Sequence, residues 1–250
     1  LSLPSKNIDK LKDLIDDITF LNKVRLNIAV EHDDESFLKL KIKIRDKIVA
    51  DGLQEFDYDL EKNGEHVNAE QFNSLLEDKN TITVDMRNHY ESEIGHFKGA
   101  DLPDVDTFRE SLPIINDKYK NQKTKKNILM YCTGGIRCEK ASAYLIKNGY
   151  KNVYQLEGGI IEYARQIKKY DIENKFIGKN FVFDNRRAER ISKQIISFCH
   201  QCDEKCDNHV NCNNEACHLL FLQCEKCKIK FDGCCSFDCK EIYSLPIDDQ

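Results

Sequence analysis

The chain has 250 residues, of which 40% are hydrophobic and 32% charged, and its net charge is −5. This length predicts two compact domains, or one domain with appendages. The acidic balance argues against a protein that coats nucleic acid by bulk charge alone. No uninterrupted apolar run is long enough to span a bilayer, so we expect no membrane partner. The first residue is Leu1 rather than Met, which leaves open a targeting signal upstream of it.

The first sixty residues predict a small piece of mixed helix and strand. Residues 7–20 carry apolar side chains at helical spacing, and residues 24–30 and 37–45 alternate with the period of a strand. In the second strand this period places four cationic side chains on one face: Lys39, Lys41, Lys43 and Arg45. Such a face fits the solvated side of a sheet, and it also fits a surface that contacts phosphates.

After a polar linker at residues 51–66, the chain alternates between strands and helices. We expect strands at residues 81–86, 127–131 and 152–156, and helices at residues 68–76, 107–112, 139–150 and 160–170. Pro113 is expected to end the second of these helices. The alternation predicts an α/β fold with a parallel sheet covered on both faces. Ligands bind such folds at the carboxyl ends of the strands.

A cysteine opens the loop that follows the strand at residues 127–131. The loop residues are Thr133, Gly134, Gly135 and Ile136, and Arg137 closes the loop at the start of a helix. Glycines and a helix N-terminus bring several N–H groups toward one centre, and these donors and the arginine favour ionisation of a thiol. We therefore predict that Cys132 is a catalytic nucleophile assisted by Arg137. The alternative is a buried, inert thiol, and a core position is what we expect for Cys138.

Only four residues separate Cys132 from Arg137. This is fewer than in cysteine phosphatases, and so small a ring suits the outer sulfur of a persulfide better than a phosphate. The loop resembles that of the rhodanese family. Two further stretches resemble the same family in the same order: "VDMRNHYESEIGHFKGA" at residues 84–100 and "YQLEGGIIEYA" at residues 154–164. Within the first stretch we expect Asp85 and Arg87 to form a buried ion pair that braces the loop.

Ten of the twelve cysteines lie between Cys199 and Cys239. In a reducing cytoplasm, where we expect this protein, such a density favours metal binding over a disulfide scaffold. The spacing predicts one zinc site with the ligands Cys199, Cys202, Cys224 and Cys227. A second site would draw on Cys206, Cys212, Cys234, Cys235 and Cys239, with His209 as an alternate ligand. Interleaved pairing fits the spacing equally well, and disulfides, free thiols or a redox relay to Cys132 are the alternatives.

The middle of the chain and its tail together resemble the bacterial rhodanese-like tRNA uridine hydroxylase family. The resemblance rests on "MYCTGGIRCEKASAYL", "EGGIIEYARQ", "FIGKNFVFDNR" and the tail that begins "CHQCDEKC". It implies a partial ferredoxin-like (acylphosphatase-like) domain at residues 1–60, a rhodanese domain at residues 61–171 and a cysteine-rich region at residues 172–250. It also implies an enzyme in which Cys132 is essential. The implied reaction is the oxygen-dependent hydroxylation of the wobble uridine to 5-hydroxyuridine in the anticodon stem-loop of tRNA.

The implied reaction takes molecular oxygen as co-substrate, and the sequence holds no iron-triad, flavin or nicotinamide motif. We expect the Cys132 thiolate to add to C6 of the uracil ring, so that C5 can react with oxygen, while Arg137 and the loop amides stabilise negative charge. A predicted basic helix offers further contacts to the RNA backbone, beside the strand at residues 37–45: Arg186, Arg187 and Arg190. The alternative functions are a sulfurtransferase that carries a persulfide on Cys132 and a non-catalytic, zinc-stabilised binding module.

Overall fold

The structure is a computed structural model that describes residues 7–22, 24, 26, 28, 44, 47 and 49–246. Its first element is helix α1 (Ile8–Asp16), at the place where apolar periodicity predicts a helix, and the 3₁₀ turn η2 (Thr19–Leu21) follows. The two strands predicted at residues 24–30 and 37–45 fall almost entirely outside the described residues. The same holds for the four cations of the second strand, Lys39, Lys41, Lys43 and Arg45.

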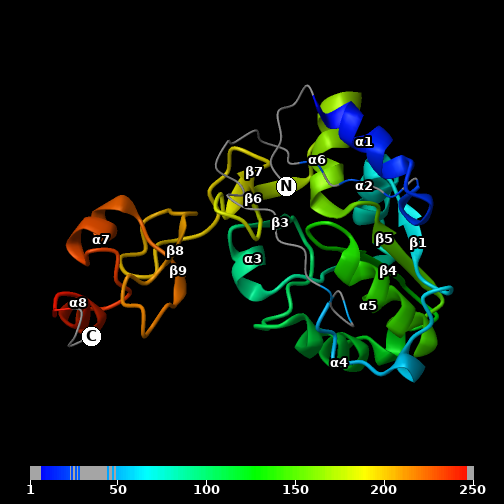
Figure 1. Ribbon diagram of the computed structural model, residues 1–250. Coiled ribbons are helices and arrows are strands. Elements are labelled where there is room, and N and C mark those ends of the chain that lie inside the picture. Colours follow the sequence, from blue (N-terminus) through cyan, green and yellow to red (C-terminus); the bar gives the residue numbers. More distant parts are fainter. Residues whose placement is uncertain are drawn as a thin grey trace.

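A four-stranded parallel sheet forms the middle of the chain (Figure 1). In spatial order its strands are β1 (Glu65–Val67), β5 (Asn152–Leu156), β4 (Asn127–Tyr131) and β2 (Thr81–Asp85). Every neighbouring pair runs parallel, so all the carboxyl ends lie at one edge. The predicted α/β fold and its three strands are confirmed. Strand β1 was not predicted, because a strand of three residues is too short to show a period.

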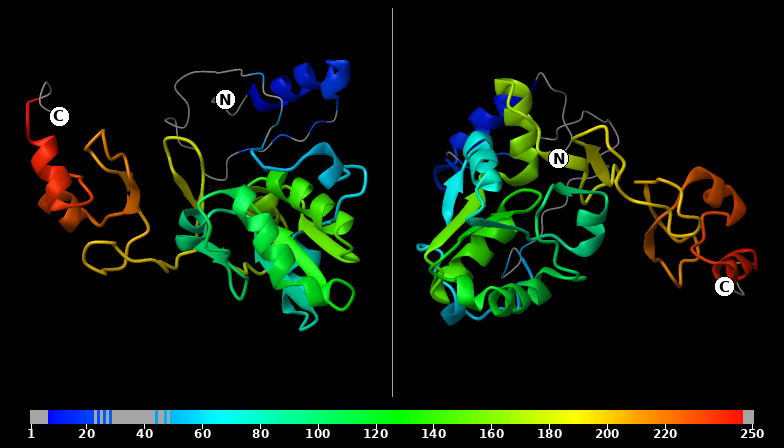
Figure 2. Two further views of the ribbon diagram at one scale, coloured as in Figure 1. Left: turned by 90° about the horizontal axis from the view of Figure 1, so that it is seen from below. Right: turned by 180° about the vertical axis from the view of Figure 1, so that it is seen from behind.

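Helices cover both faces of this sheet (Figure 2). One face packs against α4 (Phe108–Lys118) and α5 (Ile136–Lys147), and the other against α2 (Ala69–Glu77) and α6 (Gly159–Tyr170). In the central strand β4, Ile128 and Met130 pack with the first pair of helices, and Leu129 and Tyr131 pack with the second. Since consecutive strand residues point to opposite faces, all four side chains are buried.

Helix α4 does not end before Pro113, as we expected, but continues through it to Lys118. The proline has no N–H to donate, so the helix lacks one hydrogen bond there. Leu112 and Ile115, on either side of the proline, are each 1% exposed and belong to the core between α4, α5 and the sheet. Burial of each of these side chains contributes about 1.5–3 kcal/mol, which outweighs the lost bond.

A second sheet joins the chain beyond α6 to the segment between β2 and α4. It is antiparallel, with the order β3 (Gly95–Phe97), β6 (Phe176–Phe181) and β7 (Ala188–Arg190). Strand β6 approaches β3 so closely that a Cβ atom on Gly178 would lie 2.1 Å from the carbonyl oxygen of Ile94. Only glycine fits this position, where φ is also positive at 91°.

The basic segment between β6 and β7 is a turn and not the helix we predicted. Phe181 pairs with Ala188 in antiparallel register, and residues 182–187 connect the two strands. The Asp184 carboxylate accepts a hydrogen bond from the backbone N–H of Arg186 at 3.0 Å, and Arg187 has a positive φ of 57°. A side chain that binds backbone two residues further on gives the chain an alternative to a helix, and the apolar period does not reveal it.

The cysteine-rich region forms a small unit to one side of the parallel sheet (Figures 1 and 2). It holds the antiparallel strands β8 (His209–Asn211) and β9 (Leu220–Leu222) and the helices α7 (Glu225–Lys230) and α8 (Phe237–Tyr243). Leu222 packs with Ile94 and Phe181, and the Nε2 atom of His200 lies 2.7 Å from a carboxylate oxygen of Glu93. The unit therefore contacts the second sheet and its surroundings.

The remaining described elements are short: η3 (Glu55–Asp57), α3 (His89–Glu93) and η4 (Lys120–Gln122). Helix α3 lies directly before β3 and carries Glu91, whose carboxylate pairs with Arg137 after the cysteine loop. Within the described residues, no helix combines the length and the apolar character that a membrane crossing requires.

Candidate active site

Cys132 lies at the carboxyl end of β4, in the loop that leads into α5. Gly135, directly before α5, has a φ of 94° and donates its backbone N–H to the Cys132 Sγ at 3.1 Å. Glycine adopts this backbone conformation without strain, so the loop can turn back on the thiol. The side chain is 1% exposed, but its sulfur has a hydrogen-bond donor, which a merely apolar burial would not supply.

The start of α6 packs against the backbone of the cysteine loop. A Cβ atom on Gly159, whose φ is 64°, would lie 2.4 Å from the carbonyl oxygen of Cys132. That oxygen accepts a hydrogen bond from the Ile160 N–H at 3.0 Å, and the Thr133 carbonyl oxygen accepts one from the Ile161 N–H at 3.2 Å. The second glycine of the "LEGG" stretch is therefore needed for this close backbone contact.

The surroundings of Cys132 lower the pKa of its thiol to about 6. The largest cause is a hydrogen bond with the Cys138 side chain; the positive charge of Arg137 and backbone N–H groups act in the same direction, and burial opposes them. Cys138 is fully buried, as predicted, and burial raises its pKa well above the usual range. At neutral pH Cys138 is thus a protonated donor, and the thiolate form of Cys132 is favoured.

The partner of Arg137 is Glu91, a residue to which we assigned no role from the sequence. The Nη1 and Nη2 atoms of Arg137 lie 2.6 and 2.8 Å from the two carboxylate oxygens of Glu91, whose side chain is 0% exposed. Burial alone would lower the pKa of Arg137, but the hydrogen bond and charge of Glu91 raise it above its ordinary value. The glutamate stands in the rhodanese-like stretch at residues 84–100, and only its position in space reveals this contact.

Asp85 and Arg87 form the predicted buried ion pair, with Nη2 and Oδ2 2.7 Å apart and both side chains 0% exposed. Arg87 also donates to the carbonyl oxygens of Gly95 at 2.6 Å and of Glu91 at 3.4 Å. Arg87 thus holds the backbone of Glu91, the residue that binds Arg137, and of Gly95 four positions further on. It acts on the cysteine loop through Glu91 and makes no direct contact with the thiol.

Cys132 lines a cavity of about 490 Å³, a volume typical of small-ligand sites. The walls come from the cysteine loop, from Val49 in the segment before η3, from Arg109 on α4 and from Phe183 in the turn between β6 and β7. Phe183 is 65% exposed and Ile136 is 44% exposed. The Cys132 sulfur therefore lies in a site with an aromatic ring, an aliphatic side chain and a cation around it.

Three arginines predicted to contact RNA lie on the hairpin of β6 and β7, and each already binds other groups of the chain. Their partners are Asp184 and Glu189 for Arg186, the carbonyl oxygen of His209 for Arg187, and Asp207 for Arg190. These contacts hold the hairpin together and attach it to the cysteine-rich unit. A contact of the same arginines with RNA stays a prediction.

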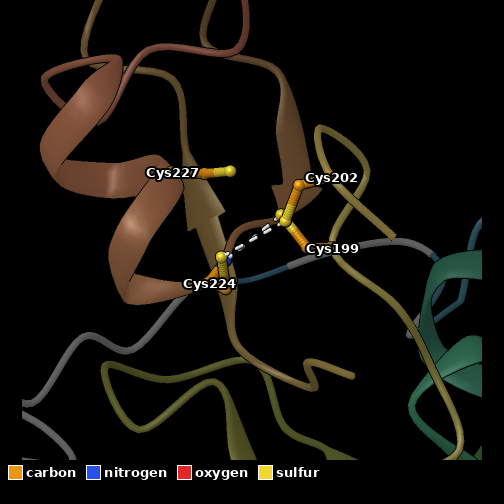
Figure 3. A group of neighbouring side chains, drawn as sticks. All are labelled: Cys199, Cys202, Cys224 and Cys227. Atoms are coloured by element: carbon orange, nitrogen blue, oxygen red, sulfur yellow. Dashed lines mark hydrogen bonds between the residues drawn. The ribbon is translucent and has the colours of Figure 1, made fainter. Parts of the chain in front are cut away.

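The cysteine-rich unit gathers eight thiols into two groups of four. Within each group, all four sulfur atoms lie within 4.8 Å of one another. The first group is Cys199, Cys202, Cys224 and Cys227 (Figure 3), and the second is Cys212, Cys217, Cys235 and Cys239. The first group is the one that the spacing predicts. The second differs from our expectation, because Cys217 belongs to it while Cys206 and Cys234 lie outside both groups.

Cys206 and Cys234, the other two cysteines of the unit, are buried and pack beside the first and the second group respectively. Cys206 is 5% exposed and Cys234 is 0% exposed. His209, the proposed alternate ligand, stacks edge-on against Phe181 with 5.2 Å between ring centroids. Adjacent cysteines such as Cys234 and Cys235 have different surroundings, so the spacing of this segment does not determine which of the two joins the group.

The two groups are built alike. The backbone N–H of Cys224 donates to the Cys199 sulfur, and that of Cys235 donates to the Cys212 sulfur, each at 3.4 Å. In both groups the first two thiols come from loops, and the last lies on a helix, α7 or α8. The likeness shows that the unit repeats one arrangement twice, although the sequence spacings differ.

Comparison with known proteins identifies the family to which a chain with this cysteine loop and this cysteine-rich region belongs. A model of the rhodanese-like domain matches residues 68–166, and a model described as Rhodanase C-terminal matches residues 177–240. A tRNA uridine(34) hydroxylase of Photorhabdus laumondii is 52% identical, over 100% of this chain and 71% of that protein. A protein of the same name from Leptospira interrogans is 54% identical, over 100% of this chain and 68% of that protein. The chain belongs to the tRNA uridine(34) hydroxylase family.

We expect iodoacetamide to alkylate Cys132 with a rate that reaches half its maximum near pH 6, because the thiolate reacts and is lost as pH falls through the pKa. Cys138→Ala removes the largest cause of the lowered pKa, so the midpoint should rise toward the usual value of about 8.5. Mass spectrometry of the labelled peptide gives the rates. Cys206→Ala, a buried thiol outside the loop, is the control and should keep the midpoint of the unaltered protein. A Cys138→Ala midpoint that stays near 6 contradicts this account.

Glu91→Gln should destabilise the protein by about 3 kcal/mol, because it leaves the buried guanidinium of Arg137 without a counter-charge. Glu77→Gln is the matched control, since Glu77 pairs with Lys175 at the surface with 63% of its side chain exposed and such pairs contribute at most about 1 kcal/mol. Urea denaturation of the three proteins measures both differences. Equal losses in the two variants would show that the Glu91 contact is no more than a surface pair.

Proposed function

We propose that this chain hydroxylates C5 of the wobble uridine of tRNA to give 5-hydroxyuridine, with Cys132 as the reactive residue. The observation that carries the proposal is a thiol of lowered pKa within a cavity large enough for a nucleoside. Membership in the tRNA uridine(34) hydroxylase family supports uridine 34 as the target. The anticodon stem-loop is the proposed partner, molecular oxygen the co-substrate and the cytoplasm the location.

In the proposed mechanism the Cys132 thiolate adds to C6 of uracil, and the electrons of the C5–C6 double bond move to C5 and the C4 carbonyl group. Loop N–H groups and Arg137 favour the negative charge that develops. C5 then reacts with dioxygen, and loss of the C5 proton and of the thiolate from C6 restores the double bond. One oxygen atom enters the base, and an external reductant supplies two electrons to reduce the other to water.

The base has to leave its stack to reach a sulfur that is 1% exposed. An anticodon loop is single-stranded, so unstacking costs less there than in a duplex. We propose that cationic side chains hold the RNA backbone meanwhile: Lys39, Lys41, Lys43, Arg45, Arg186, Arg187 and Arg190. The last three lie on the same hairpin as Phe183, which lines the cavity.

Deletion of the gene followed by complementation tests this function. Mass spectrometry of tRNA nucleosides should show 5-hydroxyuridine and its derivatives with the unaltered chain and at least about 100-fold less with Cys132→Ser, because serine is a far weaker nucleophile at neutral pH. Cys206→Ala, expressed at an equal level, is the control and should restore the modification. Unchanged nucleosides with Cys132→Ser contradict the proposal. Rapid Cys132-dependent cyanolysis of thiosulfate without any hydroxylation would instead identify a sulfurtransferase.

We also propose that each group of four cysteines binds one zinc ion. Neighbouring sulfur atoms lie 3.6 Å apart for Cys202 and Cys224, and 3.7 Å apart for Cys217 and Cys235. Four thiolates around a tetrahedral zinc ion, each about 2.3 Å from it, lie about 3.8 Å apart, whereas the sulfurs of a disulfide are about 2 Å apart. The thiol geometry thus favours metal over disulfides, and zinc would stabilise a unit with a very small apolar core.

Elemental analysis of the reduced protein should find two zinc ions per chain. Cys199→Ser and Cys212→Ser should each lose one of them, and chelation should unfold the region beyond residue 198 as observed by amide hydrogen exchange. Cys206→Ala, the matched control, should keep both ions. Zinc loss in the control, or none in the two serine variants, would contradict the assignment of ligands.

A further inference from the structure

An aromatic side chain stands exposed at the cavity of Cys132. Phe183 is 65% exposed and lines the cavity together with the cysteine loop. It lies 51 positions beyond Cys132 in the sequence, on the hairpin of the second sheet. Two separate parts of the chain thus contribute the nucleophile and the ring.

Packing fixes the position of this ring. Phe183 contacts Phe181 edge-on, with ring centroids 5.2 Å apart and an angle of 77° between the rings. Phe181 in turn contacts Tyr90 at 5.3 Å and His209 at 5.2 Å. Aromatic pairs with this geometry favour one orientation, so Phe181, itself in contact with two further rings, supports the exposed ring of Phe183.

The turn that carries Phe183 is also fixed. The backbone N–H of Val182 donates to the carbonyl oxygen of Arg187 at 2.9 Å, which closes the turn. Arg186 pairs with Asp184 inside the turn, and Arg187 donates to the carbonyl oxygen of His209 in the cysteine-rich unit. A ring on such a turn is presented to a ligand without a large ordering cost.

The other lining residues suit a flat, polar ring. Ile136 offers a half-exposed aliphatic surface next to the thiol. Arg109 and Arg137 bring donors that match carbonyl oxygens and phosphate. A pyrimidine nucleotide has the aromatic face, the carbonyl groups and the negative charge that these walls would recognise.

We infer that Phe183 is the stacking platform for the uracil ring, and that it holds C6 of the displaced base toward Cys132. This inference rests on the proposed function and adds a substrate-contacting residue to it. Every base has a π-face, so stacking of this kind supplies affinity and position rather than base identity. The choice of uracil then falls to the polar groups of the cavity.

Phe183→Ala should lower kcat/KM for hydroxylation of an anticodon stem-loop by roughly 10- to 100-fold, the loss expected for one base–aromatic contact. Phe183→Trp should retain most of the activity, since it keeps a stacking face. Tyr170→Ala is the control, because Tyr170 is 60% exposed and lies at the end of α6, outside this cavity. Both alanine variants should keep the Cys132 alkylation midpoint, which shows an intact loop. Wild-type kcat/KM in Phe183→Ala overturns the inference.

Photocrosslinking tests the contact without relying on turnover. An anticodon stem-loop with 5-iodouridine at the wobble position, irradiated in complex with the full chain, should attach to the peptide that contains Phe183, and Phe183→Ala should abolish this product. Attachment elsewhere in the unaltered chain overturns the inference. If the RNA attaches at Phe183 but the protein makes no 5-hydroxyuridine, the stacking contact is supported and the proposed hydroxylation is contradicted. Failure of the stacking inference can therefore be distinguished from failure of the proposed function.

Discussion

The site depends on how four charges compensate one another, three of them buried and the fourth, that of Arg137, on a side chain only 12% exposed. Asp85 and Arg87 form one pair, and Glu91 and Arg137 form the other, with contacts of 2.7 and 2.6 Å. A buried charge without a partner is costly, so each pair fixes the geometry of the segment that carries it. Because Arg87 also binds the carbonyl oxygen of Glu91, the end of β2, helix α3 and the cysteine loop are connected. Loss of any one of these four side chains would leave the charge of its partner without a counter-charge, and the connected segments would shift in response.

This compensation changes how the thiol is activated. Arg137 is not an isolated cation beside the sulfur, as the loop sequence suggests, because its guanidinium pairs with the Glu91 carboxylate. The lowered pKa of Cys132 therefore has the Cys138 hydrogen bond as its largest cause, with the arginine charge a smaller one. A neighbouring thiol that burial keeps protonated is a suitable donor. The site thus ionises a buried sulfur mainly through hydrogen bonds, which do not add a further charge to the interior.

The sequence predicts the parts of this protein that depend on neighbouring residues. The three strands, the covered sheet, the cysteine loop and the first cysteine group follow from period and spacing, and the Asp85–Arg87 pair was expected within the rhodanese-like stretch. The partner of Arg137 could not be predicted, because Glu91 lies 46 positions away. Cys217, which the spacing did not assign to the second site, joins that group through the fold of the small unit. The basic helix predicted to carry Arg186, Arg187 and Arg190 is absent, and α4 continues through Pro113. In the first case an Asp184 hydrogen bond overrules the local sequence signal, and in the second case core packing does.

The hairpin of β6 and β7 connects the rhodanese-like part to the cysteine-rich unit. Its Phe181 packs with Ile94 of the first part and with Leu222 of the second, and the ring of His209 lies edge-on to it. The same Phe181 supports Phe183 beside the cavity. Unfolding of the cysteine-rich unit would remove Leu222 and His209 from this contact and release the ring that faces the base. None of the eight grouped thiols lines the Cys132 cavity, but the aromatic cluster around Phe181 connects their unit physically to that cavity.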